Sequence, residues 1–121
     1  MEELVLVVDD DERNAKLVRD VLEAAGMRTL SATTAAEGIA LAREHRPDIV
    51  LMDLRLPDLD GAAAARRLRA DALTAQVPVV ALSAIRMADA APLRDEVFAD
   101  YIEKPIDVLG FAARVRALAG G

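Results

Sequence analysis

The sequence contains no cysteine, so neither a disulfide framework nor a thiolate metal site can form. Aromatic residues make up only 2% of the chain, which argues against the base-stacking surfaces of single-strand binders. The 15 basic residues are outnumbered by 21 acidic ones, which argues against binding to nucleic acid or anionic membranes. No apolar run is long enough to cross a bilayer, and the acidic start Met1-Glu2-Glu3 is unlike a signal peptide. These absences predict a cytoplasmic protein that binds neither nucleic acid nor membranes.

The chain does contain enough apolar material for one well-packed domain. Its 121 residues suit one domain and not two, and 54% of them are hydrophobic. Neither a linker nor a low-complexity segment divides the sequence. We therefore expect a single domain over residues 1–121, with no output domain.

Short β-branched runs alternate with segments of helical spacing. Such alternation predicts a doubly wound (βα)5 fold of the α/β class, with a parallel five-stranded sheet inside an α/β/α sandwich. The runs that we interpret as strands are 4–8, 27–32, 49–52, 77–84 and a short one within 97–105. The segments 61–70, 86–96 and 106–119 are interpreted as helices, in addition to one after each of the first two strands.

Local signals mark the limits of the first two helices. Gly26 is placed to end the first helix, and Thr34 with Glu37 forms a capping box that opens the second. The residues expected on the buried face of the first helix are Leu17, Val18, Val21, Leu22 and Ala25.

Charged and polar residues stand at the carboxyl ends of the expected strands. Asp9 and Asp10 follow the first strand, Asp53 follows the third, Ser83 lies at the end of the fourth, and Lys104 follows the fifth. Ligands of open α/β sheets bind beyond this edge, so we expect these side chains to converge.

The chemistry of such a cluster follows from its charge. Carboxylates that lie together stay ionised at low cost only if a cation joins them. Oxygen ligands favour a hard ion, Mg²⁺ ahead of Ca²⁺. A lysine and a hydroxyl beside the ion would complete a cradle for a phosphoryl group, and one carboxylate could be the nucleophile. Asp53 is the best candidate nucleophile because it is the single acid on the central strand.

Simpler interpretations exist for each residue alone. Asp9, Asp10 and Asp11 could all be acids that cap the first helix. A lone Lys104 would be a solvated surface lysine. The spacing of Asp9 and Asp10 relative to Asp53 and Lys104 favours the functional interpretation for these two acids, whereas Asp11 fits the helix start.

Four motifs together resemble the receiver domain of two-component response regulators. They are VVDDD (7–11), DIVLMDLRLPDLDG (48–61), VPVVALSA (77–84) and YIEKP (101–105), in the order and spacing of that family. The resemblance covers essentially the whole chain and is strongest to the stand-alone DivK type. It implies a flavodoxin-like, CheY-like sheet with strand order 2-1-3-4-5.

The resemblance also implies a role for each site residue. Asp53 matches the phosphoacceptor, Ser83 the switch hydroxyl and Lys104 the phosphoryl-binding lysine. Tyr101 matches the aromatic switch residue, and the peptide bond before Pro105 is usually cis in the family. The implied ion is Mg²⁺, for which Mn²⁺ could substitute. Its implied ligands are Asp9, Asp10, Asp53 and the backbone carbonyl of Arg55.

One segment departs from the family pattern. Residues 86–96 have a helical composition, but Pro92 interrupts them, and no glycine precedes the fifth strand as it does in the family. We expect a short or shifted fourth helix there.

The function implied by the resemblance is a signalling switch rather than a turnover enzyme. A histidine kinase or histidine phosphotransfer protein would phosphorylate Asp53, and the face from Arg86 to Leu118 would bind a downstream protein. The alternative is a degenerate receiver that binds partners without using phosphate. An aspartate-nucleophile phosphatase fits less well, because that class needs a second acid two residues after the nucleophile, where this chain has Arg55.

Overall fold

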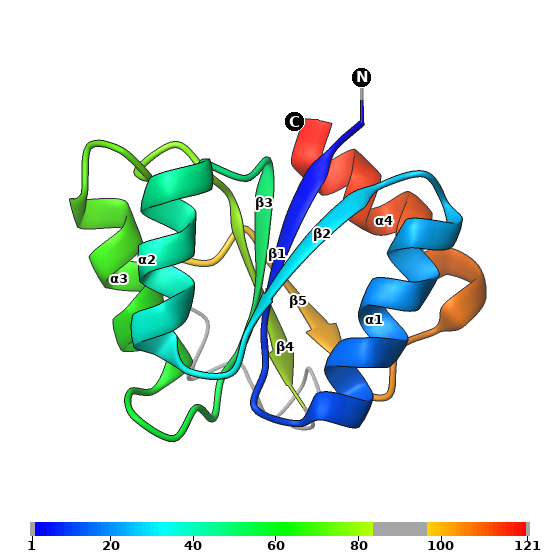
Figure 1. Ribbon diagram of the computed structural model, residues 1–121, viewed down its shortest axis with the longest axis horizontal. Coiled ribbons are helices and arrows are strands. Elements are labelled where there is room, and N and C mark those ends of the chain that lie inside the picture. The colour runs from blue at the N-terminus through cyan, green and yellow to red at the C-terminus, as the bar shows by residue number, and fades with distance from the viewer. Residues whose placement is uncertain (1, 84–96, 121) are drawn as a thin grey trace.

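One parallel sheet with helices on both faces makes up the computed structural model, which describes residues 2–83 and 97–120 (Figure 1). The strands are β1 (Leu4–Val8), β2 (Arg28–Ala32), β3 (Ile49–Asp53), β4 (Val79–Ser83) and β5 (Asp100–Glu103). The helices in this part of the chain are α1 (Glu12–Ala24), α2 (Ala35–His45), α3 (Gly61–Ala70) and α4 (Val108–Gly120). The helix expected over 86–96 lies outside the described residues.

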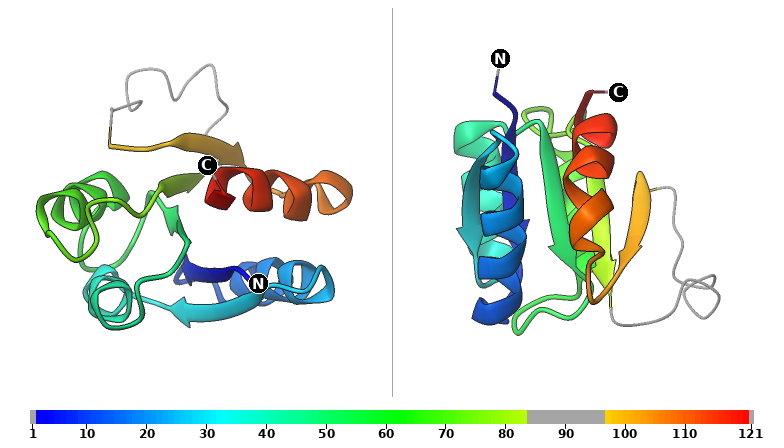
Figure 2. Two further views of the ribbon diagram at one scale, coloured as in Figure 1. Left: turned by 90° about the horizontal axis from the view of Figure 1, so that it is seen from above. Right: turned by 90° about the vertical axis from the view of Figure 1, so that its right-hand side faces the viewer.

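The strand order is β2-β1-β3-β4-β5, and all neighbouring strands are parallel. This confirms the predicted α/β class and the order 2-1-3-4-5. Helices α2 and α3 cover one face of the sheet, and α1 and α4 cover the other (Figures 1 and 2). Because all strands run in one direction, their carboxyl ends share one edge, and β3 lies at its centre.

Both faces of the sheet are buried, and alternate residues of a strand contribute to two separate cores. In β1, Val5 and Val7 pack with α1 and α4, whereas Leu6 and Val8 pack with α2 and α3. Strands that are covered on both sides appear in the sequence as continuous apolar runs, which explains why they were easy to locate.

Helix α1 lies between the two residues that the sequence marked as its end signals, Asp11 and Gly26. The Asp11 carboxylate is its N-cap and accepts the backbone N–H groups of Arg13 and Asn14. Gly26 follows the helix with a φ of +90°, a conformation that glycine adopts at little cost. The predicted buried face of α1 was wrong at one position. Leu17 is 41% exposed and lies beside the residues that face the sheet. Those residues are Ala15, Val18 and Leu22.

The predicted capping box opens α2. The Thr34 hydroxyl accepts the N–H of Glu37, and the Glu37 carboxylate turns back to accept the N–H of Thr33, one residue before the cap. Within the described residues, none of the helices has the length and apolar character needed to cross a membrane.

Candidate functional site

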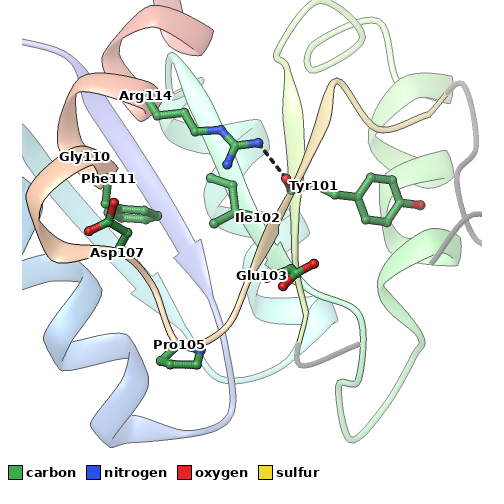
Figure 3. A pocket seen from close by; sticks show the side chains of 8 residues that line it. All are labelled: Tyr101, Ile102, Glu103, Pro105, Asp107, Gly110, Phe111 and Arg114. Atoms are coloured by element: carbon green, nitrogen blue, oxygen red, sulfur yellow. Dashed lines mark hydrogen bonds between the residues drawn. The ribbon is translucent and has the colours of Figure 1, made fainter. Parts of the chain in front are cut away.

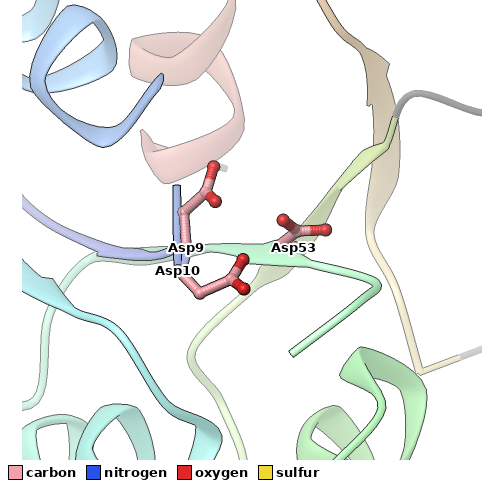
Figure 4. A group of neighbouring side chains, drawn as sticks. All are labelled: Asp9, Asp10 and Asp53. Carbon is pink, nitrogen blue, oxygen red and sulfur yellow. The ribbon is translucent and has the colours of Figure 1, made fainter. Parts of the chain in front are cut away.

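The side chains predicted from the strand ends do meet at one place. Carboxylate oxygens of Asp9, Asp10 and Asp53 all lie within 4.8 Å of one another (Figure 4). The ammonium nitrogen of Lys104 lies 2.9 Å from Asp53 Oδ2 and 3.1 Å from Asp9 Oδ2. Ser83 ends β4 beside them, and its backbone carbonyl accepts the N–H of Lys104 at 2.7 Å. The sequence-based cluster is therefore a real spatial cluster.

Asp9 is fully buried, and three donors surround its carboxylate. The backbone N–H of Asp11 donates to it at 2.9 Å, the side-chain amide of Asn14 at 2.5 Å and the Lys104 ammonium at 3.1 Å. Burial alone would raise the pKa of Asp9, but these three donors outweigh it and hold the pKa below its usual value. Asp9 is therefore a permanently ionised group at neutral pH.

Asp53 has fewer donors, and its ionisation is less favoured. Its Oδ1 accepts the backbone N–H of Arg55 at 2.9 Å, and its Oδ2 accepts from Lys104. Burial raises the pKa of Asp53 above its usual value, the charge of Asp9 adds to this, and the two donors only partly oppose it. A cation bound beside Asp53 would lower this pKa again.

Lys104 remains a cation in this setting. Burial acts to lower its pKa, but the hydrogen bonds and charges of Asp53 and Asp9 outweigh burial and raise the pKa. The end of β5 positions the lysine, and the following peptide bond to Pro105 is cis, as the sequence comparison with the family predicted.

The charges of the cluster fit a hard divalent cation. The three ionised carboxylates with Lys104 carry a net charge of about −2, which one such ion would neutralise. Two of the carboxylates are buried and Asp10 is exposed, so the group opens to solvent on one side. Oxygen donors alone suit Mg²⁺ rather than a softer transition metal.

The loop after β3 brings the main chain of Arg55 close to this group. Arg55 forms a short antiparallel bridge with Asp60, which in turn caps α3. Gly61 begins α3 so close to the strand end that a Cβ atom there would lie 2.4 Å from the carbonyl oxygen of Asp53. Glycine is the residue that permits this approach.

Tyr101 lies on β5 and is buried on the face covered by α2 and α3. Its ring packs edge-to-face against Phe98, with the ring centroids 5.4 Å apart. Phe98 was not predicted from the sequence as the packing partner of Tyr101.

Two polar residues near the site were also missed. Asn14 occupies the third position of α1, where side chains often reach back past the helix start, and that signal could have identified it. Asp58 accepts the backbone N–H groups of Ala35 and Ala36, which are more than twenty residues away in the sequence. No local pattern indicates such a contact.

Comparisons with known proteins agree with this geometry. The family model for the response regulator receiver domain matches residues 5–116. The polar-differentiation response regulator DivK of Brucella anthropi is 38% identical over 121 residues, covering 99% of this chain and 98% of its own, and DivK of Brucella ovis is 37% identical over the same shares.

Solved structures show the same relationship. The receiver domain of a sensor histidine kinase from Pseudomonas aeruginosa, with a magnesium ion coordinated in its active-site cleft, superposes with a TM-score of 0.90 at 28% identity over the full length of both chains. A CheY-like receiver domain from Methylobacillus flagellatus superposes with a TM-score of 0.87 at 26% identity, over 98% of this chain and 99% of its own. The chain therefore belongs to the response regulator receiver domains of two-component signalling.

Proposed function

We propose that Asp53 accepts a phosphoryl group in a Mg²⁺-dependent reaction and that this modification changes the protein-binding surface of the domain. The observation that carries the proposal is the buried Asp53 carboxylate held against Lys104 and within 4.8 Å of two further acids. A phosphoryl group placed there would meet an ammonium group on one side and a cation site on the other.

In the proposed reaction, a carboxylate oxygen of Asp53 attacks the phosphorus of a phosphohistidine on a donor protein. The P–N bond breaks, and its electron pair leaves on the imidazole nitrogen, which takes up a proton. Lys104 already contacts Asp53 Oδ2, so its ammonium can follow the transferred phosphoryl oxygens. The carboxylates of Asp9, Asp10 and Asp53 and the carbonyl of Arg55 would hold Mg²⁺. The bound ion would neutralise negative charge on the transferred phosphoryl oxygens.

Family membership supports both the donor and the ion. Receiver domains act with histidine kinases or histidine phosphotransfer proteins, and we propose one of these as the donor. The Pseudomonas aeruginosa receiver domain carries magnesium in its active-site cleft, which supports Mg²⁺ at the equivalent carboxylates of this chain.

We further propose that the phosphorylated form is recognised on the face from Arg86 to Leu118, as far as the structure describes it. A pocket of about 360 Å³ opens there between β5 and α4 (Figure 3). Its lining combines the apolar ring of Phe111 with the charges of Glu103 and Arg114, and Arg114 also bonds the carbonyl of Tyr101 at 2.8 Å. Ser83 on β4 and Tyr101 on β5 connect this face to the site. The two strands are neighbours in the sheet, and their carboxyl ends lie at the site.

Hydrogen exchange measured by mass spectrometry tests whether phosphorylation changes this face. With acetyl phosphate and Mg²⁺, we expect altered protection in peptides from β5 and α4 of the wild-type protein. Ser83→Ala should still be phosphorylated but show a much smaller change, because its hydroxyl can no longer bond the phosphoryl group. Ser31→Ala, at an exposed serine of β2, should behave as wild type. Identical exchange with and without phosphorylation would instead favour the degenerate interaction module.

A further inference from the structure

A single carboxylate ties the loop between β3 and α3 to the start of α2. Asp58 Oδ1 accepts the N–H of Ala35 at 2.8 Å, and Asp58 Oδ2 accepts the N–H of Ala36 at 3.0 Å. The hydrogen bonds from Ala35 and then Ala36 lower the pKa of Asp58. The carboxylate that joins the loop to α2 is therefore ionised at neutral pH. The carboxylate also lies at the positive end of the helix dipole.

The start of α2 has other side-chain partners of its own. The Thr34 hydroxyl accepts the N–H of Glu37, and the Glu37 carboxylate accepts the N–H of Thr33. Asp58 accepts the N–H groups of Ala35 and Ala36, in the first turn of the helix, which an isolated helix leaves without partners. The loop therefore completes the cap of a helix that belongs to a different part of the chain.

The same loop carries the main chain expected to hold the metal ion. Its inner end is fixed where the N–H of Arg55 donates to Asp53 and where Arg55 bridges to Asp60. Its outer part is exposed at Pro57 and Asp58, and the bonds from Asp58 to α2 fix it there. The carbonyl of Arg55 thus belongs to a segment that is held at both ends.

We propose that Asp58 is a positioning residue for metal binding, which holds the β3–α3 loop against α2 so that the Arg55 carbonyl stays directed to the ion site. The inference rests on the proposed function in one respect, the assignment of that carbonyl as a ligand. Groups that orient metal ligands in this way commonly affect metal affinity although they do not touch the ion. Thermodynamic linkage requires the reverse effect as well, so bound Mg²⁺ should strengthen the contact between Asp58 and α2.

Magnesium titration of three variants, followed by NMR without a phosphodonor, tests this role. Asp58→Ala should weaken Mg²⁺ binding about tenfold. Thr34→Ala weakens the same helix start but leaves the loop attached, so its affinity should equal that of the wild type. The Mg²⁺ affinity of Asp58→Asn should lie between those of Asp58→Ala and the wild type, because the amide oxygen of asparagine still accepts one N–H group. Equal Mg²⁺ affinities of the asparagine and alanine variants would show that only the lost charge matters, and would overturn the positioning role.

Exchange of the Ala35 and Ala36 amide protons provides a readout that is independent of affinity. In the wild type these amides should exchange more slowly with Mg²⁺ bound, and in Asp58→Ala the ion should make no difference. Equal weakening of Mg²⁺ binding by Asp58→Ala and Thr34→Ala, or no weakening by Asp58→Ala, would overturn the inference and leave the proposed function intact. A wild-type protein that binds no Mg²⁺ would instead contradict both.

Discussion

Replacing Lys104 with methionine should destabilise the metal-free protein by about 3 kcal/mol at neutral pH, because two buried carboxylates lose their shared cation. The Lys104 side chain is only 17% exposed, and its partner Asp9 is fully buried, so water compensates for the loss only in part. The midpoint of thermal unfolding in EDTA, followed by circular dichroism, should fall by about 10 °C. Phosphorylation should also slow, by on the order of 100-fold, since a donor to the transferred oxygens is gone.

Both Mg²⁺ and acid should reduce this loss of stability. Mg²⁺ supplies positive charge to the same carboxylates, so the unfolding midpoint of Lys104→Met should rise more on adding Mg²⁺ than that of the wild type. Burial raises the pKa of Asp53 above its usual value even with Lys104 present, and without the ammonium the pKa rises further. The folded variant then binds a proton more tightly than the unfolded chain, so its stability recovers as the pH falls through that raised pKa.

Lys16→Met is the matched control for Lys104→Met. It removes the same charge from an ion pair with Asp20 in which both side chains are more than half exposed. We expect a change within about 0.5 kcal/mol. A similar small change in Lys104→Met, with no response to Mg²⁺, would contradict the charge balance described for the site.

Replacing Gly61 with alanine should destabilise the protein by about 3 kcal/mol, although alanine is the better helix former. The new Cβ atom would lie 2.4 Å from the carbonyl oxygen of Asp53 and 2.9 Å from Leu54 Cα, and both are backbone atoms that cannot rotate away. Either α3 must move off the sheet or the strand end that carries Asp53 must bend. Thermal unfolding should detect the loss of stability, and magnesium titration should detect weaker binding at the displaced strand end.

Gly110→Ala provides the matching substitution in another helix. Gly110 lies on an exposed part of α4, and among the described residues its Cβ would approach only the Asp107 side chain, at 3.3 Å. We expect this variant to be as stable as the wild type or slightly more stable. Equal stability of the two alanine variants would show that Gly61 does not limit the packing of α3 on β3.

The strands were predictable because burial on both faces of the sheet leaves continuous apolar runs in the sequence. β1 and α3 have the predicted limits, 4–8 and 61–70. The fourth strand begins two residues later than expected, at Val79, and Ala84, the last residue expected in it, lies outside the described residues. Pro78 has no N–H to donate to the sheet, although its carbonyl still accepts the N–H of Val50 at 3.0 Å.

The cluster of site residues was predictable for a topological reason. Once the strands are known to be parallel, residues at their carboxyl ends must meet, and Asp9, Asp53 and Lys104 do so. What the sequence could not supply is the contact between Asp58 and α2, which depends on how the loop folds back over the edge of the sheet. The opposite pKa directions of Asp9 and Asp53 also depend on donors that only the folded chain assembles.

The intact mass of the protein after incubation with acetyl phosphate tests the central claim most directly. With Mg²⁺ we expect one added phosphoryl group on the wild type, none in the presence of EDTA, and none on Asp53→Asn, which keeps the shape of the side chain but lacks the nucleophilic carboxylate. A wild-type protein that gains no phosphoryl group, or an Asp53→Asn variant that gains one, would contradict the assignment of Asp53 as the phosphoacceptor.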